Sequence, residues 1–72
     1  MKLIETETNK VVAIVVENPK TKEFEFEIVD TENHILKDGD VYIKSGEQDQ
    51  VAFILGDEIV YKTGKYDCVN ID

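Results

Sequence analysis

The most regular pattern in this chain is the alternation of charged and apolar residues between Glu23 and Ile28, where the sequence reads EFEFEI. Successive side chains of a β-strand point to opposite faces of the sheet. A strand here would place its two phenylalanines and Ile28 against a core and its three glutamates on the other face. The carboxylates of this row, which belong to Glu23, Glu25 and Glu27, would lie about 6–7 Å apart. That spacing is of the same order as the spacing of phosphates along a nucleic-acid strand.

A second pattern is the unbroken apolar run from Val11 to Val16, which is β-branched except for one alanine and has a charged residue at each end. Runs of this kind are typical of strands that are buried on both faces or covered on one face by a partner chain. Residues 18–21 read Asn-Pro-Lys-Thr, which predicts a turn. We therefore expect the run to pair with residues 23–29 as a hairpin.

Turn residues separate the remaining apolar segments. Asp38-Gly39 is a two-residue hairpin turn of the type that needs positive φ angles. Residues 45–50 have two interpretations: a polar loop that leads into a strand at 51–55, which the lack of a helical stripe favours, or a short helix capped by Ser45. The expected strands are residues 2–6, 11–16, 23–29, 34–37, 41–44, 51–55, 58–62 and 66–71.

Seven or eight short strands at a spacing of about 8–10 residues, without a convincing helix, predict an all-β fold. The connections are short enough for antiparallel hairpins throughout. The length of 72 residues allows one domain with one small core. We therefore expect a single all-β domain over residues 1–72, a small antiparallel barrel, roll or sandwich joined by tight hairpins.

The charge of the chain is strongly acidic, because 16 aspartates and glutamates outnumber 8 lysines and give a net charge of −8. Residues 1–36 and residues 37–72 each contain eight acids and four lysines, so the charge is spread over the folded body. Arginine, the preferred residue for bidentate recognition of phosphates and bases, is absent. Since affinity for nucleic acid depends on neutralising phosphates, we expect no direct binding to nucleic acid.

The residues that could carry chemistry do not form a catalytic pattern. His34 and Cys68 are the only histidine and cysteine, and no glycine-rich oxyanion loop surrounds the cysteine. We expect a half-buried structural thiol and a surface histidine at a strand edge. A zinc site needs about four ligands with local spacing, and the acids of residues 30–40 lack the pattern of a calcium loop. The sequence therefore predicts a protein that is not an enzyme and has no cofactor or metal.

Localisation is inferred from the start of the chain and from its apolar segments. Residues 1–4 are followed at once by Glu5 and Glu7, so there is no apolar signal-peptide core. The longest apolar run has six residues, whereas a membrane-spanning helix needs about 20. A single cysteine cannot form an internal disulfide. We expect a cytoplasmic protein with no membrane association.

The glutamate row is the best candidate for a partner-binding surface. The candidate residues are Glu23, Glu25, Glu27, Glu5, Glu7, Glu17, Tyr42, Tyr61 and Tyr66. The glutamates outside the row would extend it if their strands lie beside it, and tyrosines are enriched at interfaces because their rings are apolar and their tips polar. Tyr61 and Tyr66 could face each other across the turn at Thr63-Gly64. The simpler interpretation is that the row is a solvated face that blocks aggregation and that the tyrosines pack across strands.

Two function classes remain after these exclusions, with an enzyme as a distant third. The first is a small acidic protein that inhibits or modulates a basic, nucleic-acid-handling protein partner by mimicking a nucleic-acid backbone. Small acidic proteins of this composition are often counter-defence proteins of phages or mobile elements, so we associate the first class with them. The second is a structural subunit of a homo-oligomer whose interface is the strand at residues 11–16, through Val12, Ile14 and Val16. A homodimer that displays two acidic faces would combine both.

Overall fold

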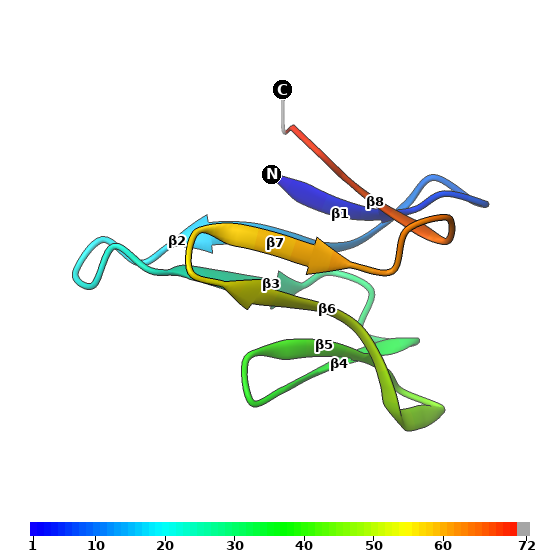
Figure 1. Cartoon of the computed structure of the whole chain (residues 1–72). Helices are drawn as coiled ribbons and strands as arrows, with labels where there is room; N and C mark the ends of the chain where they lie inside the picture. Colours follow the sequence, from blue (N-terminus) through cyan, green and yellow to red (C-terminus); the bar gives the residue numbers. More distant parts are fainter. Residues whose placement is uncertain (71–72) are drawn as a thin grey trace.

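The computed structural model describes residues 1–70, apart from the side chains of residues 47 and 48, and its elements are all β-strands. The strands are β1 (Lys2–Glu5), β2 (Lys10–Glu17), β3 (Phe24–Ile28), β4 (His34–Lys37), β5 (Asp40–Ile43), β6 (Gly46–Leu55), β7 (Glu58–Tyr61) and β8 (Tyr66–Val69). They form two antiparallel four-stranded sheets, in the orders β3-β2-β1-β8 and β4-β5-β6-β7 (Figure 1). The all-β prediction is confirmed, and the arrangement is that of a small sandwich or roll.

The core takes side chains from both sheets. Its buried members are Leu3, Val12, Ala13, Val15, Phe26, Val41, Val51, Ala52 and Tyr66. Phe24 and Ile28, which share a face of β3 with Phe26, pack against this cluster. The alternation in β3 therefore works as the sequence predicts, with aromatic rings inward and glutamates outward. The described residues contain no helix that is long and apolar enough to cross a membrane.

Two of the hairpins have two-residue turns, and the φ angles of these turns are those that their residue types favour. Asp38 and Gly39 join β4 to β5 at φ angles of 52° and 84°, so both positions are left-handed, as predicted. Gly56 and Asp57 join β6 to β7, and Gly56 has a φ angle of 66°. A positive φ at the first turn position is the case in which glycine is favoured. The strand ends are therefore fixed by local turn chemistry.

A β-bulge in the first sheet changes the side to which one residue of β2 points. Leu3 pairs with Ala13 and Ile4 with Val11, so Val12 is an extra residue in β2 at this point. Val12 and Ala13 are both fully buried. The expectation that Val12 faces a second copy does not hold at this position, because the bulge turns its side chain into the core of its own chain.

The outer face of β2 is partly covered by neighbouring side chains. β2 lies between β1 and β3, and its outward residues Ile14 and Val16 are half-buried. The residues opposite them on β3 are Glu27 and Glu25. The strand is thus buried on its inner face and only half-buried on its outer face. Of the two expectations for this run, burial on both faces within the chain is wrong, because no second layer among the described residues covers the outer side. Coverage of this face by a partner chain stays a prediction.

Most of the ambiguous segment at residues 45–50 is extended and not helical, with Ser45 in the turn that precedes the strand. β6 starts at Gly46 and runs without interruption to Leu55. Its first part pairs with β5 through irregular register, since Tyr42 lies opposite Gln50 and Ile43 opposite Gly46. The strand predicted at residues 51–55 is confirmed. The polar loop predicted before it is wrong for residues 46–50, because these register shifts allow a polar segment to pair without a regular alternation of its side chains.

A buried hydrogen-bond network joins the two sheets. His34 on β4 is 3% exposed, and its Nδ1 lies 3.1 Å from Asp30 Oδ2, while its Nε2 lies 3.1 Å from the Tyr66 hydroxyl on β8. Lys10 Nζ lies 3.3 Å from the other oxygen of Asp30. The expected surface histidine is therefore wrong. Its two ring nitrogens have polar partners from separate segments, and buried polar groups are stable when they are satisfied in this way.

Candidate protein-binding groove

The glutamate row is exposed to solvent along the outer edge of the first sheet. Glu23, Glu25 and Glu27 are all exposed, and β3 is an edge strand. Among the described residues, the salt bridges join Asp30 to Lys10 and to His34. The three carboxylates of the row therefore have no cationic partner within the part of the chain that the structure describes. Their charge is available to another molecule.

The other predicted glutamates do not extend this row. β2 lies beside β3, but Glu17 is opposite Phe24 and therefore shares the inward side of the strand. Glu5 is on β1, which β2 separates from β3, and it accepts a hydrogen bond of 3.0 Å from the Thr8 hydroxyl. Glu7 is exposed in the turn that follows β1. The row thus consists of Glu23, which comes directly before β3, and the two β3 glutamates Glu25 and Glu27.

The three predicted tyrosines do not form a common surface. The half-buried Tyr42 lies near Lys37, whose Nζ is 5.9 Å from the ring centroid. The half-buried Tyr61 donates a hydrogen bond of 3.2 Å to Asp67, and this bond raises the pKa of the phenol. Tyr66 is 6% exposed and belongs to the core, so it is not available to a partner. The Tyr66 hydroxyl lies 3.1 Å from His34 Nε2, so the hydroxyls of Tyr61 and Tyr66 contact different groups.

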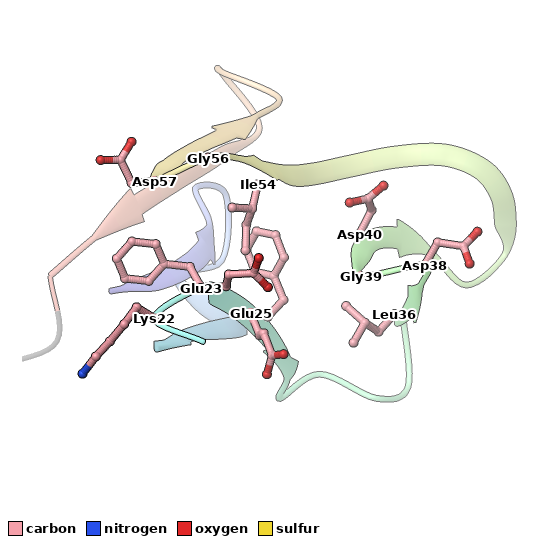
Figure 2. A pocket seen from close by; sticks show the side chains of 12 residues that line it. Lys22, Glu23, Glu25, Leu36, Asp38, Gly39, Asp40, Ile54, Gly56 and Asp57 are labelled. Atoms are coloured by element: carbon pink, nitrogen blue, oxygen red, sulfur yellow. The ribbon is translucent and has the colours of Figure 1, made fainter. Parts of the chain in front are cut away.

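What the structure adds to the row is a groove beside it, which local sequence patterns do not reveal. The groove has a volume of about 750 Å³ and lies between β3 on one side and the β4–β5 hairpin and the β6–β7 turn on the other. Figure 2 shows Glu23 and Glu25 across from Leu36, Asp38 and Asp40. The lining residues are Lys22, Glu23, Phe24, Glu25, Phe26, Leu36, Asp38, Gly39, Asp40, Ile54, Gly56 and Asp57.

The lining combines apolar side chains with a ring of carboxylates. Phe24, Phe26, Leu36 and Ile54 supply the apolar part, and Leu36 is 45% exposed although it is a large apolar side chain. Five carboxylates and a single cation, Lys22, surround them. An apolar floor with polar groups around it is the usual composition of a binding site. The sign of this ring favours a cationic ligand.

The buried Asp30–His34–Tyr66 network is the arrangement closest to a catalytic one. An aspartate, a histidine and a hydroxyl in series is the order found in enzymes that activate a nucleophile. Here the hydroxyl is that of a buried tyrosine, and burial, with smaller contributions from the charges of Glu5 and Asp30, raises its pKa. A phenol of raised pKa remains protonated and is a poor nucleophile. The geometry of this network therefore fits a structural role, in which it connects the two sheets.

Two further candidates for chemistry, Cys68 and Asp30, do not line the groove. Cys68 is half-buried, and burial raises the pKa of its thiol, which lowers its reactivity. Among the described residues, no three histidine, cysteine, aspartate or glutamate side chains are grouped closely enough to hold a metal ion. Asp30, the first of the acids considered for calcium, accepts hydrogen bonds from Asn33 and lies next to Lys10.

Comparisons of the chain with protein-family models, with curated proteins and with solved structures find no match. The groove and the glutamate row are therefore judged by their own geometry and charge.

Proposed function

We propose that this protein is a small, non-enzymatic binding protein that acts in the cytoplasm and inhibits or modulates a basic, nucleic-acid-handling protein partner. The observation that carries the proposal is the exposed row of Glu23, Glu25 and Glu27 on an edge strand, without a cationic partner among the described residues. The partner would contact the row with lysine and arginine side chains. A phage or mobile-element protein that counters a host defence enzyme would be one such modulator.

The net charge of the molecule supports the same mode of action. A net charge of −8 on a body of 72 residues creates a negative potential that accelerates encounter with a basic partner at low ionic strength. The carboxylates of the row repeat at about 6–7 Å along the strand, which is of the order of the phosphate spacing in nucleic acids. The row would therefore compete with nucleic acid for a basic groove.

Reversal of the row's charge tests this proposal. We expect E23K/E25K/E27K to weaken partner binding by more than about 100-fold, because each close charge pair across an interface contributes about 1.5 kcal/mol or more. The matched control is E7K/E32K/E58K, which changes the net charge equally at exposed sites outside the groove. Circular dichroism verifies that both variants are folded.

The partner for this measurement is obtained by capture from host lysate with tagged protein at low and high salt. Recovery of a basic nucleic-acid-binding protein that is lost at high salt and displaced by added DNA or RNA would support the proposal. Equal binding by the two triple variants would contradict it, since the location of the charge would then not matter.

A second candidate function is that of a homo-oligomeric structural subunit. The observation in its favour is the half-exposed pair Ile14 and Val16 on the outer face of β2, because apolar side chains on an open sheet face are a common site of association. Glu25 and Glu27 lie directly beside this pair and would have to be accommodated in the interface. A stable oligomer would support this candidate, and a monomer at all accessible concentrations would contradict it.

A further inference from the structure

The backbone of β3 has unpaired groups on the side that faces away from β2. The Glu23 carbonyl accepts a hydrogen bond of 2.8 Å from the Asn18 amide, and the Val29 amide donates one of 2.9 Å to the Val12 carbonyl. In an antiparallel pair such bonds occur at every second residue. The amides and carbonyls of Phe24 and Phe26 must therefore point away from β2. Within the described chain β3 pairs with β2 alone.

The strand across the groove has the same property. β4 is the edge strand of the second sheet, and the His34 amide donates to the Asp30 carbonyl at 3.1 Å and not to β5. Backbone groups of every second strand residue point to the same side. The amide and carbonyl of Leu36, two residues after His34, therefore also point away from β5. The Leu36 side chain lines the groove and is 45% exposed. The groove is thus bordered by two strand edges with unpaired backbone groups.

These strand edges favour a ligand that forms a β-strand, and the negative charge around them determines the charge that this ligand must have. A second copy of β3 would bring a second row of glutamates against Glu25 and Glu27, and like charges across neighbouring strands are destabilising. A cationic strand would pair the same positions favourably. The groove lining, which contains five carboxylates and one lysine, also favours a cationic ligand. The occupant that fits is therefore a basic segment of another protein.

We propose that the groove binds an extended basic segment of the partner, which adds to the free edge of β3 as a further strand. This inference rests on the proposed function and specifies how the partner is recognised. Residues of the segment opposite Phe24 and Phe26 would share their inward face and place apolar side chains on the floor near Leu36 and Ile54. Residues opposite Glu25 would share the outward face and carry lysine or arginine. The recognised pattern alternates basic and apolar residues.

A pair of synthetic peptides tests this pattern directly. The probe is acetyl-KVKVKVK-amide with a fluorescent label, and its control is acetyl-KKKKVVV-amide, which has the same composition and charge without the alternation. Strand addition predicts that the alternating peptide binds at least about tenfold more tightly by fluorescence anisotropy, because only it satisfies both faces at once. Equal affinities would overturn strand addition and leave a non-specific charge attraction.

Two exposed leucines provide the matched variants. Leu36 lines the groove, whereas Leu55, which is 64% exposed, does not. We expect L36S to weaken binding of the alternating peptide by about fivefold or more and L55S to leave it unchanged. Both side chains are exposed, so both variants should fold. Equal effects of the two substitutions would contradict the groove as the binding site.

Amide hydrogen exchange measured by NMR distinguishes strand addition from surface attachment. In the free protein the amides of Phe24 and Phe26 should exchange rapidly, while those of Glu25 and Glu27 are protected by β2. The bound peptide should slow exchange at Phe24 and Phe26 by at least about tenfold. Unchanged exchange there would overturn the inference. Because the triple charge reversal measures partner binding independently, that outcome would leave the proposed function standing.

Discussion

Asp30 is the residue on which the acid stability of the fold depends most directly. Burial of its side chain favours the neutral acid, but hydrogen bonds from Asn33, Lys10 and His34 outweigh this effect and lower the pKa below the usual 3.8. A carboxyl group whose folded-state pKa is depressed stabilises the protein above its unfolded pKa, and this stabilisation is lost as the pH falls through the folded pKa. The stabilisation from Asp30 is therefore complete near neutral pH, begins to decline near the unfolded-state pKa of about 3.9 and is lost only as the pH falls through the lower folded-state pKa.

Substitution of Asp30 tests this dependence. We expect D30N to lose about 1–3 kcal/mol of unfolding free energy near neutral pH, because its partners lose a charged acceptor in a buried position. The difference from the unsubstituted protein should shrink below about pH 4. Urea denaturation at several pH values measures it. E27Q, at an exposed site, is the control and should change stability by less than about 0.5 kcal/mol. A D30N difference that is constant with pH would contradict the assignment.

Single residues were predicted well where the local pattern determines them and poorly where it does not. The alternation of β3 correctly predicted the exposure of its glutamates and the burial of Phe26. The burial of His34 was missed because its partner Tyr66 is 32 residues away in sequence. No local signal distinguishes such a histidine from one at the surface. A nearby acid, Asp30, is compatible with either environment.

At the scale of elements, the two-residue turns determine where the strands end. Gly39 has a φ angle of 84°, and a side chain there would contact nothing within 4 Å. We therefore expect G39A to lose about 1–2 kcal/mol purely through backbone strain, since an L-residue is disfavoured in the left-handed region. The control is D57A, at the second position of the β6–β7 turn, where φ is not positive. Thermal unfolding of both variants measures the difference, and equal stabilities would exclude a role for the backbone angle.

The strands were predictable because their signals lie within a few residues of each other, as in the apolar run of β2 and the Asp38-Gly39 turn. The bulge at Val12 was not predictable from the same signals. It depends on the register between β1 and β2, which a uniformly apolar run does not specify. A run in which every position is apolar leaves open which side chains enter the core.

At the scale of the whole molecule, the groove is the feature that sequence patterns leave out. Its walls come from β3, from the β4–β5 hairpin and from the β6–β7 turn, which belong to two different sheets. Each segment has an adequate local explanation: Asp38 is a turn residue and Leu36 belongs to a short strand. Only the packing of the sheets brings the apolar floor and the carboxylates together. The glutamate row was the one part of this site that the sequence identified.

The oligomeric state is the whole-molecule property that separates the two candidate functions. We expect the protein to be a monomer of about 8.2 kDa, because its net charge of −8 opposes self-association and Glu25 and Glu27 flank the half-exposed Ile14 and Val16. Multi-angle light scattering over a range of concentrations and at high salt, where repulsion is screened, measures the mass. A stable dimer that I14K dissociates, while the more distant E58K does not, would favour the structural subunit. A monomer under all conditions would contradict the structural subunit and would support the proposed binding protein, whose surface is the exposed acidic edge strand.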